Sequence, residues 1–448
     1  MDPKNAPYRL ILVDDSSFIR KLITDIFRDE NDFEVVGVAT DGQHGLRLAA
    51  QQALKGHAVE VVILDIEMPI LDGLSALQHF TSLEPAPKIV MASSLTKRGA
   101  AASLRALTMG ASDYVCKPAN MDGYGGDTFR SELVSKVRCW AKAARRSQKQ
   151  EAKTVQEGGI EQPLRNPVKT DNTKSPSKSA GLFSNIAKTS SFSSSRCEDS
   201  KAKTDTNETL SKTNKNEQLS SYQKPDNQKN SIARPHISDA SKRQTTRQTQ
   251  AHKSHPVIKA IAIGGSTGAP QALHKLLGAL KYAQNVPIFI TQHMPPSFTT
   301  ILAEQLSKTS GKKCIEAQNG ETITNSSVFI APGDFHMRTK RSSQNIVLDV
   351  YQDEPINFCR PSVDPMFSSL ANCFGKNLLA IVLTGMGHDG LDGCKDVAKH
   401  GGYIIAQDEA TSVVWGMPGA VTKAGLANLV LPLDKIAPTI DSMLGVEK

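Results

Sequence analysis

The sequence contains no closely spaced pair of cysteines and no long apolar run. Its seven cysteines are scattered and odd in number, with no Cys-x-x-Cys pair. This pattern indicates reduced thiols in a cytosol rather than a disulfide framework or a zinc site. No apolar run approaches the ~20 residues of a membrane helix, and the polar residues 1–7 are unlike a signal peptide. We therefore expect a cytoplasmic protein that is not inserted in a membrane.

The chain is also relatively poor in hydrophobic residues, at 39% of 448 residues. One segment accounts for this and for the net charge of +8. Residues 142–253 hold 22 basic and 11 acidic residues, a net +11, so the rest of the chain carries 8 − 11 = −3. Ser, Thr, Lys, Asn and Gln dominate residues 144–255, which predicts a disordered basic linker. Its one apolar island, residues 181–186, is either a chance cluster or a docking peptide.

Residues 1–143 alternate between strand and helix patterns, which predicts one α/β domain with a doubly wound parallel sheet. Short apolar runs mark five strands, and a helix closes the domain at about residue 144. The predicted strands cover residues 9–13, 33–39, 59–64, 89–92 and 112–116.

Residues 256–448 return to the same alternation and predict a second α/β domain of Rossmann-like type. The predicted strands end at residues 264, 292, 331, 383 and 406, and residues 346–350 fit a hairpin strand beside the main sheet. Two domains and a linker thus account for the whole chain.

Polar residues in the first domain follow the predicted strands, so they should gather at the carboxyl edge of the sheet. They are Asp14, Asp15, Asp65, Ser93 and Lys117. Clustered carboxylates favour a cation, and oxygen ligands favour Mg²⁺. An aspartate beside Mg²⁺ and a lysine can attack a phosphoryl group. Taken singly, each aspartate would more simply be a helix cap and the lysine a solvated charge.

In the second domain, Ser266 occupies a glycine turn between a predicted strand and a helix that opens at Pro270. Backbone N–H groups surround a side chain at such a turn. The position suits a nucleophile, and it equally suits a phosphate cradle, although the turn lacks a Walker lysine. A nucleotide site therefore remains an alternative at this point.

Two further polar residues follow strands of the second domain, His293 and Asp389. An imidazole can take the proton of a serine hydroxyl, and a carboxylate on the other ring nitrogen fixes the tautomer. Glycines around Met386 allow backbone N–H groups to approach a substrate oxygen. His388 is a rival base, whereas Cys394 lies inside a predicted helix and is discounted as a nucleophile.

The first domain resembles response-regulator receiver domains. The matching motifs are Val13-Asp-Asp-Ser16, Leu64-Asp-Ile-Glu-Met-Pro69 with Asp72-Gly73, Ser93, Gly110-Ala111 and Lys117-Pro118. The resemblance implies that Asp65 accepts a phosphoryl group from a histidine kinase, with Ser93 and Lys117 completing the switch. It also implies that Asp14, Asp15 and the backbone carbonyl of Glu67 hold Mg²⁺.

The second domain resembles the catalytic domain of chemotaxis protein-glutamate methylesterases, the CheB family. The matching motifs are Gly264-Gly-Ser-Thr-Gly268, Gln292-His-Met-Pro295, Ala331-Pro-Gly333 with His336, Arg360-Pro-Ser-Val-Asp364, Leu383-Thr-Gly-Met-Gly387 with Asp389-Gly390, and Ala406-Gln-Asp408 through Trp415-Gly-Met-Pro418. The resemblance implies a Ser266, His293, Asp389 triad assisted at the oxyanion by Thr267 and the backbone of Met386. Ala269, His388 and the long linker depart from the family pattern.

The implied function is a phosphorylation-activated hydrolase that removes methyl esters from glutamate side chains of chemoreceptor cytoplasmic domains. The resemblance further implies deamidation of receptor glutamines, and no cofactor is expected at the esterase site. We hypothesise that the receiver blocks the active edge until Asp65 is phosphorylated. Two alternatives stay open: a second domain that only binds a ligand, and a DNA-binding regulator acting through the linker. No helix-turn-helix pattern supports the latter, so no specific nucleic-acid partner is expected.

Overall fold

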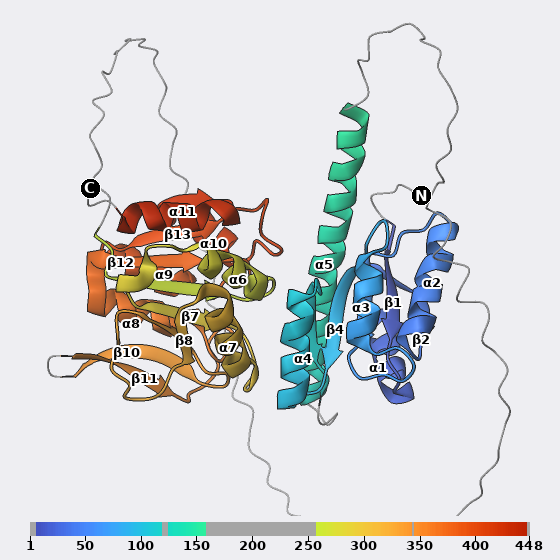
Figure 1. Cartoon of the computed structure of the whole chain (residues 1–448), viewed down its shortest axis with the longest axis horizontal. Coiled ribbons are helices and arrows are strands. Elements are labelled where there is room, and N and C mark those ends of the chain that lie inside the picture. The colour runs from blue at the N-terminus through green and yellow to red at the C-terminus, as the bar shows by residue number, and fades with distance from the viewer. Residues whose placement is uncertain (1–5, 119–123, 158–256, 343–344, 446–448) are drawn as a thin grey trace, which may run out of the picture. The chain divides into compact units, whose positions relative to one another are not determined.

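The structure is a computed structural model that describes residues 6–118, 124–157, 257–342 and 345–445 (Figure 1). The linker predicted over 144–255 lies largely outside these residues. The predicted parallel-sheet architecture is confirmed in both domains. Across the described residues, no helix has the length and apolar character needed to cross a bilayer.

The first domain is a five-stranded parallel sheet in the order β2-β1-β3-β4-β5 with helices on both faces (Figure 1). Its strands are β1 (Tyr8–Val13), β2 (Phe33–Ala39), β3 (Val61–Asp65), β4 (Lys88–Ser93) and β5 (Asp113–Cys116). Its helices are α1 (Ser17–Arg28), α2 (Gly42–Leu54), α3 (Gly73–Thr81), α4 (Lys97–Thr108) and α5 (Tyr124–Glu157).

Alternation along the strands explains this layering. In β1, Leu10 and Leu12 pack into a cluster with side chains of α1 and α5. Ile11 and Val13 point the other way, into a cluster with side chains of α2, α3 and α4. Because successive strand residues face opposite sides, a fully apolar strand buries both faces of the sheet.

Helix α5 ends at Glu157, beyond the position near residue 144 expected for its end. The added stretch contains Lys, Gln, Glu and Ala and has neither glycine nor proline before Gly158. These residues favour helix formation, so the polar composition that suggested a linker is equally compatible with a helix.

The second domain is a seven-stranded parallel sheet in the order β14-β13-β12-β6-β7-β9-β8 with a separate β10-β11 hairpin (Figure 1). The strands are β6 (Ala260–Gly265), β7 (Ile288–Gln292), β8 (Lys313–Glu316), β9 (Ser327–Ile330), β10 (His336–Ser342), β11 (Asn345–Tyr351), β12 (Leu378–Val382), β13 (Tyr403–Gln407) and β14 (Leu429–Leu431). The helices are α6 (Ala269–Ala279), α7 (Phe298–Ser310), α8 (Val363–Phe374), α9 (Leu391–Lys399), α10 (Met417–Lys423) and α11 (Leu433–Leu444), with short 3₁₀ turns at η1 (Ala283–Asn285) and η2 (Gly375–Asn377).

The hairpin predicted around residues 346–350 is confirmed as β10 and β11, which pair antiparallel. The strand patterns do not predict β8 and β14, the two outer strands of the sheet. Both are short, at four and three residues. An edge strand has only one neighbour, so its side chains need not form the long apolar run of a central strand.

Candidate active site and phosphorylation site

The predicted acidic cluster of the first domain forms at the carboxyl edge of its sheet. Asp14 directly follows β1, Asp65 ends β3, and Lys117 directly follows β5. The Nζ atom of Lys117 lies 2.8 Å from Asp14 Oδ2 and 2.8 Å from Asp65 Oδ1. The lysine thus bridges two buried carboxylates at this edge of the sheet.

Asp65 lies in a strongly desolvated position. Burial raises the pKa of its carboxyl to about 6, against the opposing effect of its contact with Lys117 and with some help from the charge of Asp14. Burial disfavours the ionised form of this carboxyl, and a nearby positive charge stabilises that form. A bound metal ion supplies such a charge.

The residues present fit a divalent cation. Single carboxylate oxygens of Asp14, Asp15 and Asp65 lie within 4.8 Å of one another, and oxygen-only ligand sets suit Mg²⁺. The side chain of Glu67 instead pairs with Arg98 at 3.4 Å on the surface. The assignment of its backbone carbonyl to the metal stays a prediction.

The buried state of Asp65 gives a testable pH dependence. The folded-state pKa, about 6 against an ordinary 3.8, means that the native protein binds more protons than the unfolded chain between about pH 4 and 6. Stability therefore falls as pH rises through this window. In EDTA at pH 7, we expect Asp65→Asn to raise the stability of the first domain by about 3 kcal/mol, the free energy that corresponds to this pKa shift.

Thermal melts of the full chain at pH 5 and pH 7 measure this effect. The advantage of Asp65→Asn should be smaller at pH 5, and Mg²⁺ should reduce it by stabilising only the wild type. A variant that is less stable than wild type at pH 7 in EDTA would show that the lysine contacts outweigh burial.

Ser266 lies in the second domain on the turn between β6 and α6, as predicted. Its backbone N–H donates to the Thr384 carbonyl at 3.1 Å, and its carbonyl accepts from the Gln292 side chain at 3.0 Å. Gly268 continues the turn with φ +78°, a conformation that favours glycine. The backbone at Ser266 is thus fixed by two neighbouring strand ends.

A glycine that follows β12 allows another loop to approach this serine closely. A Cβ added to Gly385 would lie 2.9 Å from the Ser266 Cβ and 2.3 Å from the Met417 sulfur. Any side chain at this position would therefore collide with its surroundings. The close approach explains why glycine occupies position 385 of the Thr-Gly-Met-Gly motif.

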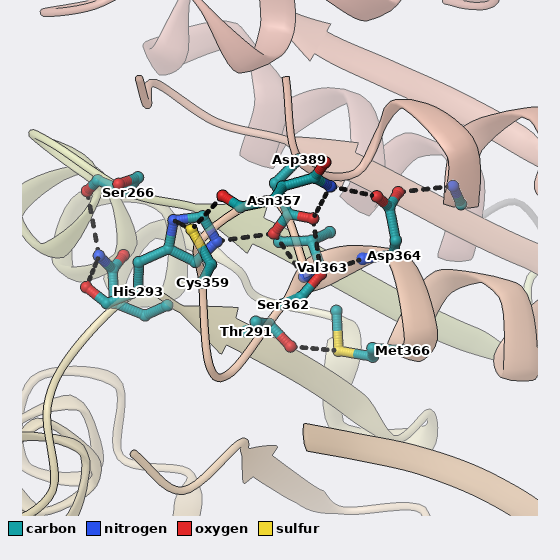
Figure 2. A network of polar contacts seen from close by, with 12 residues as sticks. Ser266, Thr291, His293, Asn357, Cys359, Ser362, Val363, Asp364, Met366 and Asp389 are labelled. Atoms are coloured by element: carbon teal, nitrogen blue, oxygen red, sulfur yellow. Dashed lines mark hydrogen bonds and ion pairs between the residues drawn. The ribbon is translucent and has the colours of Figure 1, made fainter. Parts of the chain in front are cut away.

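His293 and Asp389 are brought together as predicted (Figure 2). His293 directly follows β7, and its Nε2 lies 2.7 Å from Asp389 Oδ2. Asp389 is 2% exposed and precedes α9 by one residue, Gly390. Because a carboxylate accepts, the Nε2 atom carries a proton and Nδ1 is the atom left for catalysis.

Asp389 is held by four donors. Its Oδ1 accepts from Ser362 Oγ at 2.6 Å and from Asn357 Nδ2 at 3.1 Å, and its Oδ2 accepts from the Val363 N–H at 2.7 Å as well as from His293. Burial alone would raise the pKa of Asp389, but these hydrogen bonds hold it well below its usual value. The carboxylate therefore stays ionised and fixed.

Ser266 and His293 are not hydrogen-bonded to each other in the described residues, and Figure 2 shows no contact from the serine hydroxyl to the imidazole. The Nδ1 atom of His293 instead lies 3.3 Å from the Cys359 sulfur. Of the two hydrogen bonds that the predicted triad requires, the one between His293 and Asp389 is formed and the one between Ser266 and His293 is not.

Cys359 also affects the charge of the imidazole. Burial lowers the pKa of His293, but the contacts with Asp389 and Cys359 outweigh burial and raise the pKa to about 10. These contacts favour the protonated ring at neutral pH. Because Nδ1 faces Cys359 rather than Ser266, and a protonated ring cannot accept the proton of Ser266, the arrangement described here is a resting one.

The remaining predicted residues also fall near Ser266. Thr267 follows Ser266 in the turn, and Met386 follows Gly385. Among the described residues, the backbone N–H groups of Thr267 and Met386 donate to no protein acceptor, as an oxyanion site requires. His388 is exposed on the surface, and burial raises the pKa of the Cys394 thiol well above its usual value inside α9. These positions do not support His388 as the base or Cys394 as the nucleophile.

Three residues of the site were not identified from the sequence: Asn357, Cys359 and Ser362. Ser362 caps α8 and lies within a motif that carried the family resemblance, so that motif was the available signal. Its N–H donates to the buried His336 ring at 3.2 Å, which in turn bonds the Glu354 carbonyl at 3.1 Å. Asn357 and Cys359 lie on the irregular stretch between β11 and α8, where no periodic pattern marks them.

Fold and site together define a class of protein, a receiver-type domain joined to an α/β domain with a serine, histidine and aspartate at one sheet edge. Comparison with known proteins agrees. Residues 10–123 match the response regulator receiver domain family, and residues 261–440 match the CheB methylesterase family.

Full-length relatives show the same combination. The chain is 40% identical to "Protein-glutamate methylesterase/protein-glutamine glutaminase of group 2 operon" of Rhodospirillum centenum over 98% of this chain and 94% of that protein. It is also 40% identical to the protein-glutamate methylesterase/protein-glutamine glutaminase of Azospirillum brasilense over 97% and 92%. The solved CheB catalytic domain of Thermotoga maritima is 39% identical, covering 42% of this chain and 98% of that one with a TM-score of 0.41. The chain belongs to the CheB family of protein-glutamate methylesterases.

Proposed function

We propose that this chain hydrolyses methyl esters of glutamate side chains in the cytoplasmic part of chemoreceptors and deamidates receptor glutamines. The named activities of its full-length relatives support this proposal. The observation that carries it is the 2.7 Å contact between His293 and a buried, ionised Asp389, at the sheet edge where Ser266 stands on its turn. The reaction would take place in the cytoplasm, where this part of a receptor lies.

The proposed chemistry is acyl transfer to serine. Ser266 Oγ attacks the ester carbonyl while its proton passes to His293 Nδ1, and the N–H groups of Thr267 and Met386 stabilise the oxyanion. The imidazolium then gives the proton to the departing methoxide, so methanol leaves and an acyl-Ser266 remains. A water molecule, deprotonated by His293, releases the glutamate carboxylate and restores Ser266. None of these steps calls for a metal or other cofactor.

The resting arrangement adds one requirement. The Nδ1 atom now contacts Cys359 at 3.3 Å, and the contacts with Asp389 and Cys359 favour the protonated ring by raising its pKa. Before the first step, Nδ1 must lose its proton and face Ser266 instead. Asp389 can hold Nε2 throughout, because its other three donors fix the carboxylate independently of His293.

The first domain supplies the proposed control. A histidine kinase would transfer a phosphoryl group to Asp65, with Mg²⁺ held by Asp14, Asp15 and the Glu67 carbonyl. Lys117 already contacts Asp65 at 2.8 Å and would neutralise the new phosphate. Ser93 is 1% exposed and bonds the Ser94 carbonyl at 3.1 Å, a contact that it can exchange for a phosphate oxygen. The phosphorylated state would favour the productive arrangement of the esterase site.

Methanol release from methylated receptor membranes, with and without a small-molecule phosphodonor and Mg²⁺, tests this function. We expect the donor to stimulate wild-type turnover and the ratio of stimulated to unstimulated rate to fall to 1 in Asp65→Asn, because no phosphoryl acceptor remains. Asp25→Asn, at a surface carboxylate of α1 paired with Arg28, is the matched control and should keep the stimulation. Stimulation that survives in Asp65→Asn would rule out Asp65 as the switch.

A further inference from the structure

The contact between Cys359 and His293 has the dimensions of a metal site. The thiol sulfur lies 3.3 Å from the ring Nδ1. A Zn²⁺ ion with Zn–S of about 2.3 Å and Zn–N of about 2.05 Å at a tetrahedral angle separates its two ligand atoms by roughly 3.6 Å. A shift of a few tenths of an ångström would therefore open the pair around the ion.

Asp389 completes the pattern expected around a zinc-bound histidine. A ligating imidazole usually donates its second N–H to a carboxylate, which fixes the ring and increases its basicity. The Nε2 atom of His293 already makes this contact at 2.7 Å. His293, Cys359 and Asp389 also form one of the described groups whose ligand atoms lie within 4.8 Å of one another.

The cysteine is accessible and is held near the ring. Cys359 is only partly buried, and its sulfur also lies 3.4 Å from the Asn357 carbonyl. Asn357 in turn donates to Asp389 and to Asp364 at 3.1 and 2.8 Å, so this stretch is tied to the same acidic residues. These contacts tie the stretch that carries the thiol to the carboxylate that also holds the imidazole.

We propose that Cys359 Sγ and His293 Nδ1 bind Zn²⁺, with Asp389 supporting His293, and that the bound ion switches the esterase off. This inference rests on the proposed function only for its inhibitory consequence. The thiol proton leaves to solvent as the Zn–S bond forms, and a proton on Nδ1 leaves in the same way. The ion then occupies the nitrogen that Ser266 needs, so no base remains for the first step.

The two sites of the chain would discriminate between metals. Thiolate and imidazole ligands favour Zn²⁺ and not Mg²⁺, whereas the carboxylates around Asp65 favour Mg²⁺. Mg²⁺ should therefore support phosphorylation without inhibiting hydrolysis, and low concentrations of Zn²⁺ should inhibit hydrolysis directly.

Binding is tested on the full chain with Co²⁺ as a spectroscopic stand-in for Zn²⁺, followed by Zn²⁺ displacement. We expect a thiolate-to-Co²⁺ absorption band in the wild type and in Cys373→Ser, a control at another partly buried cysteine of this domain. Cys359→Ser should lose the band and bind Zn²⁺ at least about 100-fold more weakly. Asp389→Asn should keep the band but bind about 10- to 100-fold more weakly, because the ligand has lost its hydrogen-bonded partner.

Inhibition is then read as the Zn²⁺ concentration that halves each protein's own metal-free rate. This concentration should rise at least about 100-fold in Cys359→Ser and stay unchanged in Cys373→Ser. A wild-type spectrum without a thiolate band, or equal Zn²⁺ sensitivity in Cys359→Ser, would overturn the proposal. The spectrum needs no turnover, so a thiolate band without any esterase activity would contradict the proposed function and leave the zinc site standing.

Discussion

Replacing Ser266 with alanine should lower methanol release at least about 1,000-fold, even with phosphodonor present. The substitution removes the hydroxyl of the proposed nucleophile on the turn between β6 and α6. The other hydroxyl on this turn belongs to Thr267, which is buried and is assigned to the oxyanion site. The hydrogen bonds that fix this residue run through its backbone N–H and its backbone carbonyl. Alanine keeps both, so the fold and receptor binding should be unchanged.

Ser326→Ala is the matched control, because Ser326 lies on an exposed turn of the same domain. It should leave methanol release at the wild-type rate. Substantial turnover by Ser266→Ala would mean that another group, Cys359 first, is the nucleophile. Unchanged ligand binding with no turnover in either wild type or variant would instead favour a binding module.

Replacing Asp389 with asparagine should lower kcat by roughly 10³- to 10⁴-fold and also destabilise the second domain. Both carboxylate oxygens of Asp389 accept hydrogen bonds, from two donors each. An amide offers one oxygen, so its NH₂ group must face one of the two donor pairs. If it faces His293, the ring adopts the wrong tautomer, and if it faces Ser362 and Asn357, those donors lose their acceptor.

Each unsatisfied buried donor costs about 1–3 kcal/mol, so the melting temperature should fall with the rate. Asp392→Asn is the control, since Asp392 is exposed on α9 and pairs with Lys395 on the surface. Turnover measured per folded molecule separates the two effects. A variant with reduced stability but wild-type kcat would show that Asp389 is structural and not part of the relay.

Much of this site was predictable because parallel sheets gather their functional residues at strand ends. Asp14, Asp65 and Lys117 directly follow or end buried strands, and the structure joins them as predicted. The same rule identified His293 and Asp389 as partners. Strand-end position is visible in sequence, since a short apolar run is followed by a polar residue.

The contacts of Cys359 could not be predicted in this way. Cys359 lies on an irregular stretch, and its position depends on tertiary hydrogen bonds such as those of Asn357 and His336. The absence of cysteine pairs argued against a zinc site, but one cysteine beside a histidine from a distant strand leaves no spacing pattern. The resting separation of Ser266 from His293 is likewise a property of the folded chain alone.

Labelling with a fluorophosphonate, which forms a stable bond only with an activated serine, tests the central claim most directly. Peptide mass spectrometry of the phosphodonor-treated wild-type chain should find the phosphonyl group on Ser266. The label should be lost in Ser266→Ala and greatly slowed in Asp389→Asn. An enzyme that releases methanol while Ser266 stays unlabelled, or one labelled at Cys359 instead, would contradict the account.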